Sequence, residues 1–185
     1  MKLRSKVVPL AAGEVLELGC GGGINMEFYD PARVTRLTGI DPSPKLLEMT
    51  RAAAAACGID ARIEGGVGEM MPFADASFDT VVTTFTLCSV QDPAAVLAEI
   101  RRVLRPGGTA LFLEHGRAPD TDVARWQRRI EPLWKRIGGN CHLTRPVCDT
   151  YRAAGFAVDR MGTGYMPKSP KPMAWVEYGT ARAEG

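Results

Sequence analysis

The chain has 185 residues, a length typical of one domain with a complete hydrophobic core. Hydrophobic residues make up 45% and charged residues 24%, and the net charge of +2 is too small to indicate nucleic acid as a partner. No stretch reaches the roughly 20 apolar residues of a membrane-spanning helix, and Pro9 interrupts the short apolar run that follows the basic start. We therefore expect a single cytoplasmic domain over residues 1–185, with 1–13 as a short N-terminal segment.

The five cysteines also indicate a reducing compartment. They form an odd set without paired C-x-x-C spacing, which argues against a disulfide framework and against structural zinc. Cys141, His142 and Cys148 lie close in sequence, but they lack the second pair that a metal site of this kind needs. The sequence therefore predicts no metal.

Strand and helix patterns alternate along the first 114 residues, as in a parallel sheet with crossover helices. The strands are expected at residues 14–18, 36–40, 61–64, 80–84 and 109–114. One helix is predicted over 44–56, with Ser43 as its cap and Gly58 as its stop. Another begins at Asp92 and ends at the R-P-G-G turn of residues 105–108.

The pattern changes after residue 114. Apolar residues at helical spacing, with four arginines between them, predict a helix over 120–137 that Pro132 must break or kink. A further helix is expected over 146–154. Two last apolar runs, at 156–161 and 173–178, predict paired edge strands.

A glycine-rich turn follows the first predicted strand, in the segment V-L-E-L-G-C-G-G-G. Its glycines can take positive φ and let a ligand approach the main-chain N–H groups at the start of a following helix. Dinucleotide oxidoreductases use G-x-G-x-x-G, whereas Ile24 stands where the third glycine would fall. A buried acid at Glu17 would repel a pyrophosphate, and it suits a ligand with an ammonium and a sulfonium group, which is S-adenosylmethionine.

The other contacts to this donor are expected where the strands end, because open parallel sheets bind ligands outside their carboxyl ends. Asp41 follows the second strand, 22 residues beyond Gly19, and its carboxylate can accept hydrogen bonds from both ribose hydroxyls. The segment G-E-M-M-P-F offers backbone to an adenine edge and Met70 or Met71 to the ring face, and the backbone near Thr84 can receive the ammonium group. The candidate cofactor-binding residues are Glu17, Gly19, Cys20, Gly21, Gly23, Asp41, Pro42, Gly68, Glu69, Met70 and Thr84.

The ordered set V-L-E-L-G-C-G-G-G, G-I-D-P-S, G-E-M-M-P-F, S-F-D-T-V-V and R-V-L-R-P-G-G resembles the class I S-adenosylmethionine-dependent methyltransferases over about residues 14–114. The resemblance implies an α/β fold, a Rossmann-like three-layer sandwich whose seven-stranded sheet is mostly parallel with an antiparallel last strand. It also implies S-adenosyl-L-methionine as donor and S-adenosyl-L-homocysteine as product. Many relatives have aspartate where Val67 stands, so the adenine amino group must be bound elsewhere.

A closer resemblance covers most of the chain. The segments T-L-C-S-V, V-L-R-P-G-G-T-A-L-F-L-E-H, the double-Trp segment and G-N-C-H-L-T-R are similar to the alkyl thiol methyltransferases called methyltransferase-like seven proteins. Those relatives imply small thiols as acceptors. They also have an apolar anchor before the first strand, where this chain has about thirteen residues, so membrane attachment is not carried over. A looser resemblance extends to phosphatidylethanolamine N-methyltransferases and quinone C-methyltransferases.

His115 and Arg145 are the candidates to orient or electrostatically assist the acceptor. The alternative for His115 is a hydrogen-bonded structural residue at a strand end. Glu114 is expected to hold His115 or contact the ligand. Trp126 and Trp134 either pack a lid helix on the sheet or touch the substrate, and the arginines beside them form a solvated face or contact acidic phospholipid.

The sequence thus predicts a methyltransferase that acts on a small molecule, with S-methylation of a thiol favoured. N-methylation of a phospholipid amine and C- or O-methylation of a quinone stay open, as do a nicotinamide-dependent oxidoreductase and a non-catalytic binding module. We expect an open, apolar acceptor pocket shaped by residues 85–92, 114–145 and 163–171, with 115–145 as an acceptor-side insertion or lid. The expected partner is a small acceptor, not nucleic acid. A monomer and a homodimer both remain open, as does contact with a membrane surface.

Overall fold

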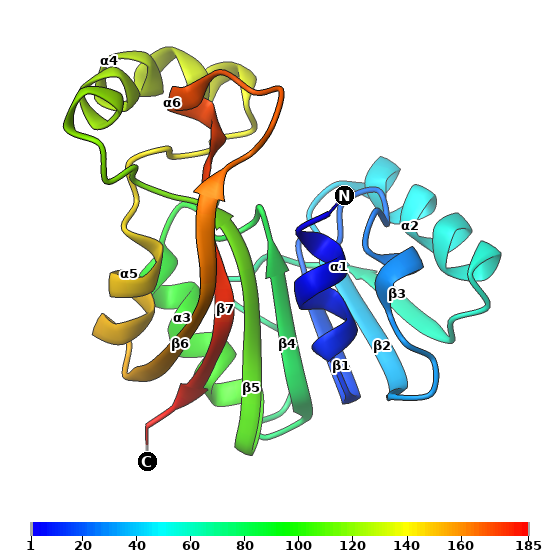
Figure 1. The fold of residues 1–185 in the computed structure, drawn as a ribbon. Helices are drawn as coiled ribbons and strands as arrows, with labels where there is room; N and C mark the ends of the chain where they lie inside the picture. The colour runs from blue at the N-terminus through cyan, green and yellow to red at the C-terminus, as the bar shows by residue number, and fades with distance from the viewer. Residues whose placement is uncertain (1, 185) are drawn as a thin grey trace.

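The computed structural model describes residues 2–184, which form a seven-stranded sheet covered by helices on both faces (Figure 1). The strands are β1 (Gly13–Leu18), β2 (Val34–Asp41), β3 (Ala61–Gly65), β4 (Phe78–Thr84), β5 (Leu104–His115), β6 (Phe156–Tyr165) and β7 (Trp175–Ala183). Their order in the sheet is β3-β2-β1-β4-β5-β7-β6, and β7 runs antiparallel to both of its neighbours. The predicted fold class is confirmed.

The strand order reverses between β1 and β4, the two strands at the centre of the parallel part. Leu18 at the end of β1 pairs with Ile40 of β2 on one side and with Thr83 of β4 on the other. The chain leaves β1 toward β2 and leaves β4 toward β5, so the two connections diverge and leave a crevice at the carboxyl ends of the strands. This crevice is where the glycine-rich turn lies.

Each face of the sheet has its own apolar core. On one face, α3 (Pro93–Val103) and α5 (Val147–Ala153) pack on β4 and β5, and Val96, Leu97 and Ile100 of α3 are fully buried. The Asp92 side chain caps α3 by accepting from the N–H groups of its first turn, as the Asp-Pro start predicts. On the other face lie α1 (Arg4–Val7), the 3-10 turns η1 (Val8–Leu10) and η2 (Met26–Phe28), and part of α2 (Pro44–Ala56).

Three local expectations are wrong. No α-helix follows the glycine-rich turn, because only ten residues separate Gly23 from β2 and they form the single 3-10 turn η2. The R-P-G-G segment does not precede the fifth strand but forms a bulge within it: Leu104 pairs with Phe78 and Thr109 with Thr80, so β5 has more residues between these pairs than β4.

The two late strands pair with each other as expected, but they are not both edge strands. β7 lies between β5 and β6, so only β6 is an edge, and the run that was expected to begin a strand at Met173 first forms the short helix α6 (Lys171–Ala174). In its place inside the sheet, β7 forms backbone hydrogen bonds on both sides, with β5 and with β6.

The helix α4 (Thr121–Ile137) lies with α6 beyond the carboxyl ends of the strands and forms a lid there (Figure 1). It continues through Pro132 without a break. The buried Gln127 ties it to the body, because its side chain accepts from the N–H of Ala118 and donates to the carbonyl of Gly116. Within residues 2–184, the helices are all too short or too polar to cross a bilayer.

Truncation of Ile100 tests the packing of α3 on the sheet. The side chain is fully buried in the larger core, so Ile100→Ala should lower the free energy of unfolding by about 2–5 kcal/mol, through lost burial and the cavity left behind. Leu133→Ala in the lid is the matched control, because that side chain is 64% exposed and its loss should change the value by less than about 0.5 kcal/mol. Urea unfolding measures both; equal effects would contradict this packing.

Candidate active site

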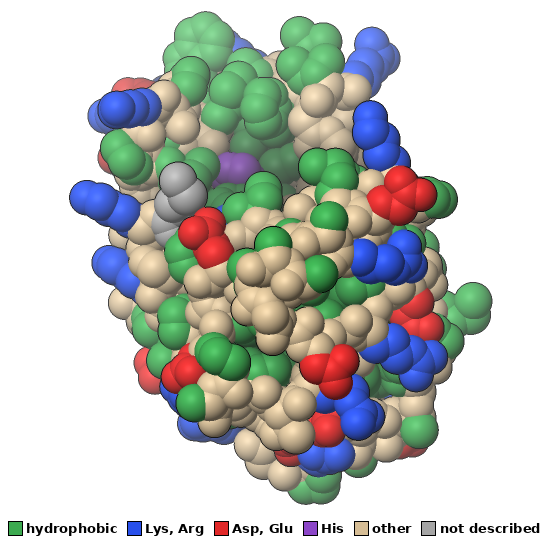
Figure 2. Space-filling view, turned by 90° about the vertical axis from the view of Figure 1, so that its right-hand side faces the viewer, with side chains coloured by type: hydrophobic (Ala, Val, Ile, Leu, Met, Phe, Trp, Pro, Cys, Tyr) green, Lys and Arg blue, Asp and Glu red, His purple; other side chains and the backbone are tan. Residues whose placement is uncertain are grey.

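A cleft of about 1060 Å³ opens at the carboxyl ends of β1, β2 and β4. Figure 2 shows a hollow on this side of the molecule, with hydrophobic side chains around it and a histidine at its base. Nine of the eleven predicted cofactor-binding residues line the cleft, and Gly23 and Met70 do not. The nine are Glu17, Gly19, Cys20, Gly21, Asp41, Pro42, Gly68, Glu69 and Thr84.

The glycine-rich turn forms the floor of the cleft. Gly19 and Gly21 have φ of +66° and +54°, which glycine adopts without strain. A Cβ at position 19 would collide with the Thr86 side chain, whereas one at position 21 would meet only a backbone oxygen at 3.9 Å and project into open space. Gly23 serves packing instead, because a Cβ there would meet Ala53 of α2.

Asp41 joins this turn to the end of β2. Its Oδ2 accepts from the Gly21 N–H at 3.0 Å and its Oδ1 from the Ser43 N–H at 2.9 Å. The carboxylate is buried except for the part that borders the cleft. An anion that is hydrogen-bonded on two sides and faces an open cleft is a ready acceptor for hydroxyl groups.

At the end of β1, Glu17 is buried and accepts from Asn25 Nδ2 and from the Tyr29 hydroxyl, each at 2.8 Å. Burial raises the pKa of Glu17 to about 7, although both hydrogen bonds favour the ionised form. Arg4 reaches the same place from α1 and donates to Asn25 Oδ1 and Thr84 Oγ1, each at 2.7 Å. Arg4 is a cleft residue that the sequence did not predict, since nothing in a short basic start indicates which cation will face the cleft.

The opposite end of the cleft is built from backbone. Gly66, Val67, Gly68 and Glu69 line it, and Val67 pairs with Met70 in an isolated bridge. The Glu69 carboxylate accepts from the Gln91 N–H at 3.1 Å, which ties this segment to the loop after β4. The Met70 side chain is 78% exposed, so it lies outside the cleft.

Two charged groups hold the loop after β4 from behind. The Glu114 carboxylate is fully buried and accepts from the N–H groups of Thr86, Leu87 and Cys88 at 3.0–3.1 Å. Burial raises its pKa even so. These backbone amides, not His115, are its partners. Arg145 closes the same loop by donating to the carbonyls of Leu87 at 2.5 Å and Val90 at 2.7 Å, and it does not line the cleft.

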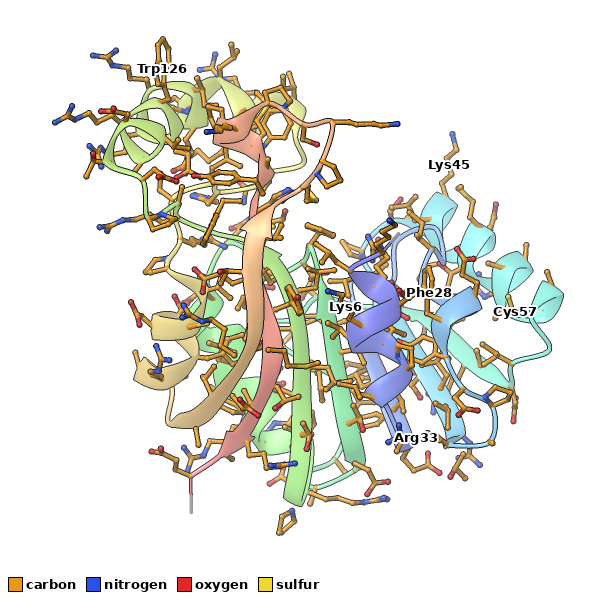
Figure 3. All side chains as sticks on the ribbon, viewed as in Figure 1. Lys6, Phe28, Arg33, Lys45, Cys57 and Trp126 are labelled. Atoms are coloured by element: carbon orange, nitrogen blue, oxygen red, sulfur yellow. The ribbon has the colours of Figure 1, made fainter. Side chains whose placement is uncertain are left out.

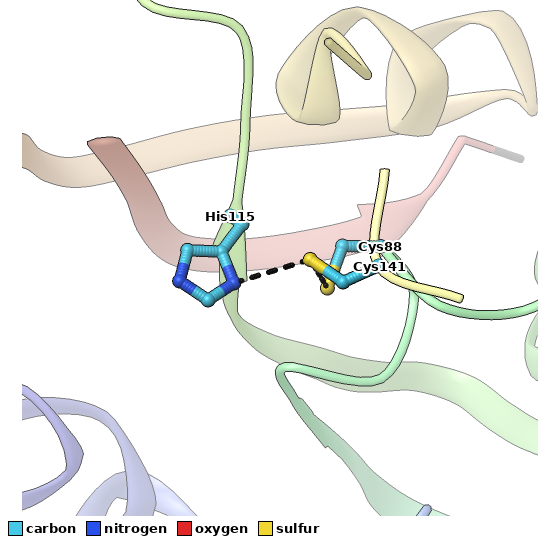
Figure 4. A group of neighbouring side chains, drawn as sticks. All are labelled: Cys88, His115 and Cys141. Atoms are coloured by element: carbon cyan, nitrogen blue, oxygen red, sulfur yellow. Dashed lines mark hydrogen bonds between the residues drawn. The ribbon is translucent and has the colours of Figure 1, made fainter. Parts of the chain in front are cut away.

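His115 ends β5 beside the cleft and is half-buried. Its ring packs against Phe85, which lines the cleft, with the ring centroids 4.7 Å apart. Its Nδ1 is 3.5 Å from Cys141 Sγ, which is 3.6 Å from Cys88 Sγ (Figure 4). Cys141, His142 and Cys148, which are close in sequence, do not form such a cluster. The His142 side chain faces Glu131, and Cys148 lies on α5.

The acceptor side of the cleft is lined by residues of 85–92 and by Gly138, Gly139 and Asn140 after α4. No residue of 163–171 lines it, so that part of the expectation is wrong: this segment leads from β6 into α6, and α6 packs against α4. Trp126 points away from the body of the molecule (Figure 3), is 54% exposed and has the Arg129 guanidinium over its ring. Trp134 packs on the buried cysteines beneath the lid.

Comparison with known proteins identifies relatives of this chain. It is 41% identical over 175 residues to the human protein "Thiol S-methyltransferase TMT1B", an alignment that covers 91% of this chain and 69% of the relative. It is 37% identical over 147 residues to human "Thiol S-methyltransferase TMT1A", covering 77% and 59%. Among solved structures, the YcgJ protein from Bacillus subtilis superposes with a TM-score of 0.74 over 95% of this chain and 94% of its own, at 18% identity.

The model of the family described as "Methyltransferase domain" matches residues 16–112, the span from β1 into β5 that builds the cleft. This span holds the glycine-rich turn, Asp41 and the cleft-lining backbone of residues 66–69, and it agrees with the resemblance that the motifs show. The chain therefore belongs to the methyltransferase domain family and is an S-adenosylmethionine-dependent methyltransferase.

Proposed function

We propose that this protein methylates the sulfur of a small alkyl thiol, with S-adenosyl-L-homocysteine and a thioether as products. The observation that carries the proposal is the 41% identity to a thiol S-methyltransferase across 91% of the chain. The cleft supports it, because the side chains of Phe85 and Val90, next to Gly138 and Gly139, give the acceptor side an apolar surface on which a short alkyl chain can pack.

The donor fits the cleft in one orientation by charge. Asp41 accepts hydrogen bonds from the ribose hydroxyls, and backbone of residues 66–69 borders the adenine. At the far end, the Glu17 carboxylate attracts the ammonium group of the amino-acid tail, and the Arg4 guanidinium pairs with its carboxylate. This orientation directs the methyl group toward the loop after β4.

The bound sulfonium supplies an activated methyl group, so the protein has to supply alignment. Holding two reactants in attack geometry contributes on the order of 7–11 kcal/mol. Glu114 and Arg145 contribute indirectly, because they fix the loop of residues 86–90 that borders both reactants. His115 lies close enough to Phe85 to set the shape and electrostatics of the acceptor side. We propose Arg145 and His115 as positioning residues for the acceptor.

Replacement of Asp41 tests the position of the ribose. Asp41→Ala should weaken binding of S-adenosylhomocysteine by about 1–3 kcal/mol, because charge-assisted hydrogen bonds to the hydroxyls are lost. Asp60→Ala, an exposed acid outside the cleft, should leave the affinity unchanged. Isothermal calorimetry measures both, and equal affinities in the two variants would place the ribose elsewhere.

The pKa of Glu17 predicts a pH dependence of donor binding. With a pKa of about 7 in the free protein, Glu17 is mostly protonated at pH 6 and half ionised at pH 7. Because the ammonium group pairs with the carboxylate, affinity for S-adenosylmethionine should rise about fivefold over this interval. Glu17→Gln should remove the rise, whereas Glu27→Gln, an exposed acid, should keep it. Donor affinity independent of pH in the unmodified protein would contradict this pairing.

The same shift has a consequence for folding. The pKa of Glu17 is higher in the folded protein than its ordinary value of 4.5, so the donor-free protein should lose stability as pH rises from about 4.5 to 7. The slope should be absent from Glu17→Gln in urea unfolding series at several pH values. A slope of the same size in both proteins would assign it to other groups.

A panel of acceptors tests the substrate class. Transfer from methyl-labelled donor should be found with small alkyl thiols such as 2-mercaptoethanol, and not with phosphatidylethanolamine or a demethylated quinol. The labelled thioether should be identified by mass. Transfer to the amine or the quinol alone would replace the thiol assignment and leave the family intact.

A further inference from the structure

Three potential metal ligands from distant parts of the chain converge beside the cleft. Cys88 lies in the loop after β4, His115 ends β5, and Cys141 follows α4 (Figure 4). Their ligand atoms all lie within 4.8 Å of one another, and among residues 2–184 no other group of three histidine, cysteine or acidic side chains meets this spacing. The separations of 26 and 53 residues along the chain explain why the sequence predicted no metal.

The distances fit a shared tetrahedral ion. Zn²⁺ binds thiolate sulfur at about 2.3 Å and imidazole nitrogen at about 2.0–2.1 Å, which places two sulfur ligands about 3.8 Å apart and sulfur and nitrogen about 3.6 Å apart. The observed separations are 3.6 Å between Cys88 Sγ and Cys141 Sγ, and 3.5 Å between Cys141 Sγ and His115 Nδ1. Only a small side-chain movement is needed to complete the third pair.

The surroundings suit thiolate ligands. Cys88 and Cys141 are buried, with Leu143, and the partly buried Trp134 packs against them. The Trp134 Nε1 is buried without a hydrogen-bond partner among the described residues. A thiolate held by a metal is a better acceptor for this unpaired N–H than a neutral thiol is. The apolar shell also limits exchange with solvent, a feature of stable metal sites.

The cluster borders the cleft at each of its three residues. His115 packs against Phe85, Cys88 precedes Ser89, and Cys141 follows Asn140; Phe85, Ser89 and Asn140 all line the cleft. Three protein ligands with a fourth position left for water or substrate are typical of catalytic zinc, whereas structural zinc has four protein ligands. The open position would therefore face the acceptor side.

We propose that Cys88, His115 and Cys141 bind a Zn²⁺ ion whose fourth position takes the sulfur of the acceptor. The metal site is independent of the proposed function, whereas binding of the acceptor sulfur rests on the proposed thiol methylation. On binding, the acceptor S–H bond breaks and its proton goes to solvent, because coordination favours the thiolate. The thiolate electron pair then forms the new S–CH₃ bond, the donor C–S bond breaks with its pair kept by the donor sulfur, and the neutral thioether leaves the metal.

Metal binding is tested without reference to activity. The reduced protein should take up one Co²⁺, with thiolate-to-cobalt charge-transfer absorption, and one equivalent of Zn²⁺ should abolish that absorption. Cys88→Ser, Cys141→Ser and His115→Ala should each weaken Zn²⁺ binding by more than about 100-fold, the upper end of the effect of an outer-shell loss. Cys57→Ser and Cys148→Ser are the controls, since Cys57 lies at the far end of α2 (Figure 3) and Cys148 lies on α5, and neither should change the affinity.

Binding of S-adenosylhomocysteine, measured in every variant, shows whether the fold is retained. No cobalt spectrum from the reduced protein would overturn the metal site, as would a Cys88–Cys141 disulfide found by mass in the freshly purified protein. Equal loss of metal in Cys148→Ser would overturn the assignment of the ligands.

The role in catalysis is tested separately. Addition of 2-mercaptoethanol to the cobalt protein should shift its absorption, and removal of the metal by a chelator should lower thiol methylation at least tenfold, with recovery when Zn²⁺ is restored. Full methylation by metal-free protein would overturn the catalytic role and leave the proposed function standing. A cobalt spectrum together with no methylation of any thiol would sustain the metal site and remove the proposed function.

Discussion

Buried carboxylates at the ends of parallel strands are the constraint on which this site depends. Glu17 lies near the carboxyl end of β1 and Glu114 near that of β5, and both side chains are buried. Burying a carboxylate costs free energy unless it is hydrogen-bonded. The two carboxylates accept hydrogen bonds from different parts of the cleft. Glu114 fixes the loop after β4 through three backbone N–H groups, whereas Glu17 accepts from Asn25 and Tyr29 in the part of the cleft near β1.

These two buried acids give the two halves of the cleft different characters. The half built by β1 and β2 is rigid and polar, with hydrogen bonds from Asp41 to the glycine-rich turn already formed. The other half consists of a loop held by Glu114 and Arg145 and a lid that is joined to the body by side chains such as Gln127 and Trp134. The YcgJ structure, at 18% identity, shares the fold.

Local sequence patterns were sufficient for most of the donor side. The strand alternation, the helix over 44–56, the glycine-rich turn and Asp41 depend on residues that are near one another in the chain, so each leaves a readable pattern. A helix was expected after the turn but is absent. The sequence did not indicate its absence, because the residues before β2 have no strong helix-stop signal until Asp30 and Pro31. The place of β7 inside the sheet depends on pairing between distant strands, which periodicity does not encode.

The acceptor side was harder to predict for the same reason. His115 was singled out, but its contacts with Phe85 and Cys141 come from the way in which three loops meet. Arg145 was expected at the acceptor and instead grips the carbonyls of Leu87 and Val90, because its planar guanidinium can satisfy two acceptors in a tight loop. Arg4 lies outside every motif of the sequence, and the packing of α1 against the sheet brings it to the cleft.

The central claim is that the cleft at the reversal of strand order holds the methyl donor. A crystal structure of the protein with S-adenosylhomocysteine tests it most directly. We predict the ribose hydroxyls on Asp41, the amino-acid tail between Glu17 and Arg4, and the sulfur facing the loop after β4. The product bound on another surface, or in this cleft with its ribose turned away from Asp41, would contradict the account.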